Sequence, residues 1–190
     1  GDGKSDLIWR RSDGAIYVWL MDEGSISSQG IIAVLDPVWF IAKSADMDGD
    51  GKADLVFRNS ASGEIYLWYM DGLSVLNMAS VGTVDPTAWE LTGVSDFNGD
   101  GRSDLLWRGV TGDTWIWLMN GAALVSAASI GNPGMTWNIE AIVDLDGLGR
   151  GGILWRNADG SLYFWRINGL FVTGMFPLPS PGLNWDVVSH

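Results

Sequence analysis

Residues 46–58 read DMDGDGKADLVFR, and residues 96–108 read DFNGDGRSDLLWR. Each stretch begins with carboxylate or amide side chains at alternate positions and ends in a run of apolar residues. Carboxylates held within about 5 Å of one another repel by roughly 3 kcal/mol per pair at an effective dielectric constant near 20. A folded loop of this kind therefore favours a bound cation, and oxygen ligands with flexible geometry favour calcium over zinc or copper.

The predicted Ca²⁺ ligands occupy positions 1, 3, 5, 7 and 9 of each loop, the seventh through its backbone carbonyl. They are Asp46, Asp48, Asp50, Lys52 and Asp54 in one loop, and Asp96, Asn98, Asp100, Arg102 and Asp104 in the other. An EF-hand would need a glutamate at position 12 and flanking helices, but Phe57 or Trp107 stands there and a strand follows. The alternative interpretation is a pair of ordinary turns with side-chain-to-backbone hydrogen bonds. Two full copies in register favour the metal.

The two loops belong to a repeat that fills the chain. The strings GDGKSDLIWR, GDGKADLVFR, GDGRSDLLWR and GLGRGGILWR begin at residues 1, 49, 99 and 147, which divides the chain into repeats 1–45, 46–95, 96–143 and 144–190. Each repeat reads as four short strands between Gly, Asp and Asn turns, at 54–58, 64–70, 76–81 and 89–95 in the second copy. The sequence therefore predicts an all-β fold, a single β-propeller domain over residues 1–190 with four-stranded antiparallel blades.

The fourth copy of the acidic loop has lost two of its predicted ligands. Asp144 and Asp146 remain, but Leu148 and Gly152 occupy positions 5 and 9. Two carboxylates are too few for tight calcium binding. We expect this loop to bind the ion weakly or not at all, and aspartate at both 148 and 152 to restore a site.

Tryptophan and arginine also follow the repeat. All twelve tryptophans fall in repeat columns, and a residue that every repeat holds is expected to pack between sheets rather than bind a ligand. One arginine follows the aromatic position of each second strand, at Arg10, Arg58, Arg108 and Arg156. These side chains are expected to pair with a nearby carboxylate or to stack on a ring.

Composition argues against several classes of function. Acidic residues outnumber basic ones 23 to 11, for a net charge of −12, so nucleic acid and anionic membrane surfaces are repelled at long range. No apolar run approaches the length of a membrane span, so membrane insertion is not expected. There is no cysteine, the single histidine is His190, and the paired carboxylates lie in the metal loops. These features predict that the protein is not an enzyme.

The repeat frame is offset from the predicted blades at both ends of the chain. The first predicted strand, Ser5–Arg10, is a second strand of a blade, and the last, Trp185–Ser189, is a first strand. Because unpaired edge strands are a liability, both are expected to find partners. They pair with one another in a closed four-bladed ring, or with neighbouring chains in a larger ring or filament. The first acidic loop shows only Asp2 and Asp6, which leaves its other ligands absent or supplied by a neighbour. We expect the native polypeptide or assembly to be larger than this chain.

The two full loops and the repeat that covers essentially all 190 residues resemble the FG-GAP/VCBS repeat family. That family comprises calcium-binding propeller blades similar to those of integrin α subunits and propeller lectins. In it the acidic loop joins the innermost strand of a blade to the second strand, and rings of seven blades are common. The resemblance implies a secreted or cell-surface, bacterial, non-catalytic module that binds glycans or a surface protein. The alternative is a structural spacer or filament subunit that calcium only stiffens.

Overall fold

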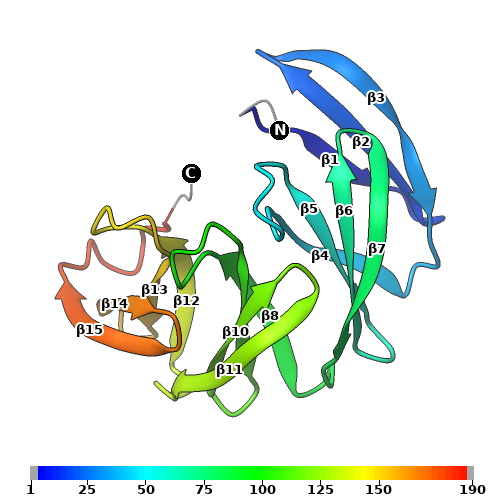
Figure 1. Ribbon diagram of the computed structural model, residues 1–190. Helices are drawn as coiled ribbons and strands as arrows, with labels where there is room; N and C mark the ends of the chain where they lie inside the picture. Colours follow the sequence, from blue (N-terminus) through cyan, green and yellow to red (C-terminus); the bar gives the residue numbers. More distant parts are fainter. Residues whose placement is uncertain (1–3, 188–190) are drawn as a thin grey trace. The chain divides into compact units, whose positions relative to one another are not determined.

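The structure is a computed structural model that describes residues 4–187 (Figure 1). Its 15 strands form four antiparallel sheets, one of three strands and three of four, which confirms the all-β prediction. No helix within residues 4–187 has the length and apolar character needed to cross a membrane. The chain divides into two compact units, Gly1–Pro86 and Thr87–His190, which are described separately.

The first unit contains the three-stranded sheet and one four-stranded sheet. The first has the order β1-β2-β3, with β1 at Leu7–Arg10, β2 at Ala15–Asp22 and β3 at Ser25–Val34. The second has the order β4-β5-β6-β7, with β4 at Trp39–Ala45, β5 at Asp54–Asn59, β6 at Glu64–Asp71 and β7 at Ser74–Thr83. Both are simple antiparallel meanders in which neighbours in sequence are neighbours in the sheet.

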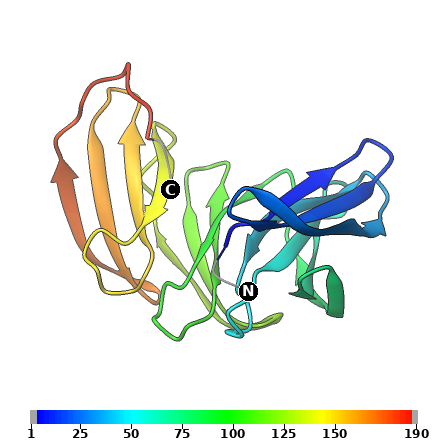
Figure 2. The ribbon, with the colours of Figure 1, turned by 90° about the horizontal axis from the view of Figure 1, so that it is seen from above.

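The second unit repeats the four-stranded meander twice. Its first sheet consists of β8 at Trp89–Ser95, β9 at Asp104–Gly109, β10 at Thr114–Asn120 and β11 at Ala123–Gly131. Its second consists of β12 at Trp137–Val143, β13 at Gly152–Asn157, β14 at Leu162–Asn168 and β15 at Phe171–Leu178. Figure 2 shows these last four strands side by side, coloured yellow to red.

The strands of the second repeat lie where the sequence predicted them, as β5 to β8. The acidic loops connect the first strand of a sheet to the second, as the family resemblance implied. One regular feature was not predicted. The first strand of each four-stranded sheet carries a register irregularity, between Ile41 and Lys43, between Leu91 and Gly93, and between Ile139 and Ala141. Such bulges add a residue and increase local twist.

Each unit has a core built from residues of both its sheets. In the first unit it contains Ile16, Leu55, Phe57, Trp68 and Met70. In the second unit it is built from Phe97, Leu106, Ile116, Ile130, Ile153, Trp155, Trp165 and Ile167. Ten of the twelve tryptophans are fully or partly buried, which confirms the packing interpretation for them, whereas Trp9 and Trp185 are exposed.

The repeated arginines make a contact that the sequence did not predict. Each donates to backbone carbonyls about 25 to 29 residues further along: Arg10 to Leu35, Asp36 and Trp39, Arg58 to Val84 and Asp85, Arg108 to Gly134 and Trp137, and Arg156 to Trp185. The expected kinds of partner are present at Arg108, which lies 4.9 Å over the Trp155 ring, and at Arg156, which lies 3.8 Å from Glu140. Carbonyls in these connections lack strand partners, and a guanidinium offers five donors to satisfy them.

The predicted strand at Trp185–Ser189 is wrong for the residues that the structure describes. Trp185 to Val187 form no strand, and Val188 and Ser189 lie outside the described residues. A β-strand requires a neighbour that completes its ladder of hydrogen bonds, and these three residues have none within the described chain. At the other end, the strand predicted at Ser5–Arg10 is present as β1 from Leu7.

Candidate metal centre

The acidic loops lie at equivalent places in three sheets, at 46–53 between β4 and β5, at 96–103 between β8 and β9, and at 144–151 between β12 and β13. Glycines at positions 4 and 6 give them their bend. Gly49 and Gly51 have φ of 83° and 81°, values that other residues rarely adopt. The same positions of the second loop have φ of 83° and 82°, so the two full loops share one backbone conformation.

In the first full loop, three carboxylates converge. One oxygen from each of Asp46, Asp48 and Asp50 lies within 4.8 Å of the others. Asp46 organises the bend, because its Oδ1 accepts the amide of Gly49 at 2.7 Å and its Oδ2 accepts that of Gly51 at 2.8 Å. The Asp50 amide donates to Asp48 Oδ1 at 3.1 Å, so the backbone amides of the loop point inward and hold the carboxylates together.

This donor set fits calcium. Calcium binds carboxylate oxygens at 2.3–2.6 Å, so two oxygens on one ion are at most about 5 Å apart, which the three carboxylates satisfy. The set contains only hard oxygen donors, which suits calcium and not zinc or copper. When bound, the ion would supply the positive charge that offsets three adjacent carboxylates. Lys52 supplies part of that charge already, since its Nζ lies 3.6 Å from Asp50 and 3.2 Å from Asp71.

The second full loop reproduces the arrangement with one amide in place of a carboxylate. Asp96 accepts the amides of Gly99 at 2.6 Å and Gly101 at 2.8 Å, as Asp46 does in the first loop. Asn98 Oδ1 accepts the Asp100 amide at 2.8 Å, and its side-chain nitrogen donates to Asp100 Oδ2 at 3.1 Å. One formal charge fewer makes this loop less repulsive without a cation, and the second loop is therefore the weaker of the two candidate sites.

The ninth-position aspartates have a structural role that the sequence did not reveal. Asp54 is 1% exposed and Asp104 is fully buried. Asp54 accepts the amides of Met47 at 3.1 Å and Met70 at 3.0 Å, and Asp104 accepts the equivalent amides of Phe97 and Met119. Each carboxylate thus ties the acidic loop to the third strand of its sheet, and neither belongs to the three-carboxylate cluster. Metal ligation by either aspartate stays a prediction, as does ligation by the carbonyls of Lys52 and Arg102.

Burial raises the pKa of both aspartates. The pKa of Asp54 rises from 3.8 to about 6, because burial disfavours the charged form more strongly than the two amide hydrogen bonds favour it. The pKa of Asp104 rises to about 6 for the same reason, and the nearby carboxylates of Asp100 and Asp96 raise it further. A cation in either loop would lower these values, since it favours the ionised carboxylate.

In the fourth loop, an arginine lies beside one of the two remaining carboxylates. Asp146 forms an ion pair with Arg166 Nε at 2.6 Å. Arg166 stands in a column that holds Leu20, Tyr69 and Leu118 in the other repeats, so only this repeat carries a cation there. The sequence shows this difference, but it does not show that Arg166 lies beside Asp146, because that contact depends on which strand faces the loop.

The structure also corrects the expectation that two aspartates would restore this loop. A Cβ atom at Gly152 would lie 2.3 Å from the ring of Phe164 and 3.0 Å from the carbonyl of Trp165. The Phe164 ring thus occupies space that a side chain at position 152 would need, whereas the other repeats hold Val18, Leu67 and Ile116 in the Phe164 column. Aspartate at 148 and 152 is therefore insufficient, and a restored site also requires smaller side chains at Phe164 and Arg166.

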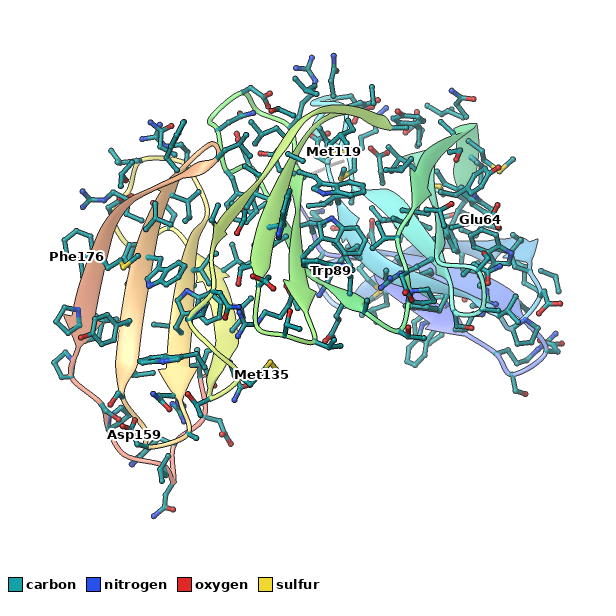
Figure 3. The ribbon with its side chains drawn as sticks, turned by 90° about the horizontal axis from the view of Figure 1, so that it is seen from below. Glu64, Trp89, Met119, Met135, Asp159 and Phe176 are labelled. Atoms are coloured by element: carbon teal, nitrogen blue, oxygen red, sulfur yellow. The ribbon has the colours of Figure 1, made fainter. Side chains whose placement is uncertain are left out.

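The first unit contains a second candidate site, a cavity of about 220 Å³ lined by Leu35, Trp39, Phe57, Glu64, Tyr66 and Trp68. Trp39 and Tyr66 make an edge-to-face pair with ring centres 5.6 Å apart, and equivalent pairs occur in both other four-stranded sheets. The pair alone is therefore a packing feature of the repeat. Glu64, labelled in Figure 3, is exposed, and its column holds Ala15, Asp113 and Ser161 elsewhere. A carboxylate also stands at this position in the third repeat, where Asp113 accepts hydrogen bonds from Thr111 and Asn132, whereas Glu64 lines the aromatic cavity.

The FG-GAP-like repeat family matches residues 1–57, a range that includes the three clustered carboxylates. No curated protein matches the chain. Among solved structures, the chain is similar to one in the crystal structure of BBS1N in complex with ARL6DN, soaked with mercury. The two chains are 20% identical, with a TM-score of 0.46. The match covers 94% of this chain and 50% of the chain in that crystal structure. Residues 1–57 are thus identified as an FG-GAP-like repeat.

Proposed function

We propose that this chain is a non-catalytic, calcium-binding repeat module in which the ion locks the loop between the first two strands of a sheet. The observation that carries the proposal is the convergence of Asp46, Asp48 and Asp50 within 4.8 Å. The loop amides hold these carboxylates in place, and the ion removes their mutual repulsion. The fourth loop supports the argument, because the sheet that lost its ligands acquired the Arg166 cation instead.

Thermal unfolding in calcium and in chelator tests this proposal. Calcium at a hundredfold excess over its dissociation constant adds about 2.7 kcal/mol per site to the free energy of unfolding. We expect Asp50→Asn together with Asp100→Asn to remove most of this response. Asp159→Asn is the matched control, because Asp159 lies in the turn at the opposite end of β13 from the acidic loop and accepts local hydrogen bonds from Ser161 (Figure 3). A melting temperature that ignores both calcium and chelator would exclude the metal site.

We propose in addition that the module binds carbohydrate on a secreted or cell-surface protein. The support is the cavity at Trp39, Tyr66 and Glu64, since sugars stack on aromatic faces while a carboxylate accepts their hydroxyl groups. An extracellular location fits loops that offer few ligands, because extracellular calcium modules work with dissociation constants of about 10⁻⁴–10⁻³ M. The net charge of −12 disfavours nucleic acid as a partner.

Glycan-array binding separates this function from that of a structural spacer. We expect Glu64→Gln to abolish binding while the melting temperature changes little, because Glu64 is exposed and glutamine can still accept the hydrogen bond that the Ser62 hydroxyl donates at 3.0 Å. Glu90→Gln is the control, an exposed glutamate on β8 outside the cavity. A protein that binds no glycan but retains its calcium response is a spacer or filament subunit instead.

A further inference from the structure

The aromatic cavity of the first unit has a negative electrostatic character. The described residues that line it are four aromatic ones, Leu35 and Glu64, and none of them is basic. Arg10 donates to the backbone carbonyls of Leu35 and Trp39, but it is not among the lining residues. The charge that a ligand meets therefore comes from Glu64 and from the ring faces, which carry the negative part of the aromatic quadrupole.

The four rings of the cavity differ in depth and in direction. Phe57 and Trp68 are buried, whereas Trp39 and Tyr66 are half-buried and lie nearer the surface. The ring planes of Trp39 and Tyr66 meet at 87°, and those of Phe57 and Trp68 at 43°. The flat face of a sugar ring can therefore stack on only one member of each pair. An ammonium group, by contrast, is attracted to every ring face within about 6 Å of it.

The Glu64 carboxylate is held in place through one of its two oxygens. The Ser62 hydroxyl donates to Oε2 at 3.0 Å, and the same hydroxyl accepts the Glu64 amide at 3.3 Å. Within residues 4–187, no lysine or arginine forms an ion pair with Glu64, and no hydrogen bond reaches its Oε1. Asp113 in the same column differs, because Thr111 donates to one of its oxygens and Asn132 to the other. Glu64 thus retains an acceptor for a ligand.

We propose that this cavity takes an amino sugar, with the protonated amine of the ligand between Glu64 and the aromatic rings. The inference rests on the carbohydrate binding proposed above and names the class of sugar. The amine donates to Glu64 in a charge-assisted hydrogen bond, which is about twice as strong as a neutral one. The apolar face of the sugar ring stacks on Trp39 or Tyr66. Sugars that carry a carboxylate are disfavoured, because Glu64 and the net charge of −12 repel them.

A pair of ligands that differ only in charge tests the role of the amine. Acetylation of the amine removes its positive charge and leaves the sugar ring unchanged, so an oligomer of glucosamine and one of N-acetylglucosamine form such a pair. In titration calorimetry, we expect the glucosamine oligomer to bind at least about tenfold more tightly, because it alone gains the charge-assisted hydrogen bond and the attraction to the rings. Added salt should reduce this preference, because Glu64 is exposed and its charge is screened.

Two matched substitutions locate the preference on the protein. Glu64→Gln keeps the shape of the side chain and removes its charge. It should weaken binding of the glucosamine oligomer at least about tenfold and weaken binding of the acetylated oligomer less, so that the preference between them is lost. Asp113→Asn removes the carboxylate at the same position of the third repeat, where both oxygens already accept hydrogen bonds, and should leave the preference unchanged. The melting temperature of each variant checks that it is folded.

Three results overturn the inference and leave carbohydrate binding or calcium binding to be judged separately. Equal binding of the two oligomers, or a preference that persists in Glu64→Gln, shows that the module binds glycans without recognising the amine. Choline carries an ammonium group without a sugar, and binding of choline as tight as that of the glucosamine oligomer shows that the sugar is not recognised. Binding of neither oligomer overturns the inference together with the carbohydrate function, whereas the calcium response in thermal unfolding is measured independently of both.

Discussion

Replacement of Asp104 by asparagine should change how the stability of the protein depends on pH. Asp104 is fully buried and links Phe97 to Met119 through two backbone amides. Its pKa is raised from 3.8 to about 6, chiefly by burial. The folded protein therefore binds the proton more tightly than the unfolded chain does, and stability declines as pH rises between those two values.

The size of this effect follows from the pKa difference. A difference of one in pKa is 1.36 kcal/mol, so the rise to about 6 corresponds to a loss of about 3 kcal/mol between pH 4 and pH 7. Asparagine is neutral throughout and resembles the protonated acid in shape. Its side-chain nitrogen cannot accept the second backbone amide, so Asp104→Asn carries a constant cost at every pH. We expect the stability of the variant relative to the original protein to rise by up to about 3 kcal/mol between pH 4 and pH 7.

Urea unfolding at several pH values, in chelator, measures this difference. Subtraction of the two curves removes every other titrating group, since both proteins share them. Asp159→Asn serves as the control, because Asp159 is exposed and its pKa is lowered by the Ser161 hydrogen bonds. Calcium should shrink the difference, because a cation beside Asp104 favours the ionised form. A difference curve that is flat from pH 4 to pH 7 in chelator would refute the reasoning.

Three further substitutions test the packing. Gly152→Asp should lower the melting temperature and create no calcium site, because of the 2.3 Å approach to Phe164, and calorimetric titration with calcium checks both. Trp155→Ala removes a fully buried ring and should cost about 3–5 kcal/mol in urea unfolding. Gly93→Ala places a Cβ 2.0 Å from Ile142 and should cost about 1–3 kcal/mol, with Ile142→Val restoring part of the loss in thermal unfolding.

The strands and acidic loops were predictable because their signals are local. The alternation of Trp, Tyr and Ile between Gly and Asp turns fixes strands such as Glu64–Asp71 within a few residues. The φ of 83° at Gly49 likewise follows from a motif that needs glycine there. Repetition strengthened both inferences, since the same pattern returns every 48 to 50 residues.

The remaining features depend on contacts between residues far apart in sequence. The sequence placed Asp54 among the metal ligands, but its hydrogen bond to Met70, 16 residues away, becomes apparent only when β6 lies beside the loop. Arg58 was expected to pair with a carboxylate or to stack on a ring, and its hydrogen bond to the carbonyl of Val84, 26 residues away, was not predicted. A residue that departs from its repeat column, such as Arg166, can be detected in the sequence. Its role becomes clear only when the structure shows that it pairs with Asp146.

The Phe164 ring has a consequence for how the repeats can diverge. The fourth repeat combines glycine at the ninth position of its loop with a larger aromatic side chain, Phe164, that fills the space beside it. Reversion of the glycine alone now creates a steric conflict, and reduction of the ring alone leaves a void. A change at either position alone is therefore destabilising, so a loop with aspartate at position 152 requires changes at both positions. Descendants of this chain should therefore retain Gly152 and a bulky residue at 164 together, or change both.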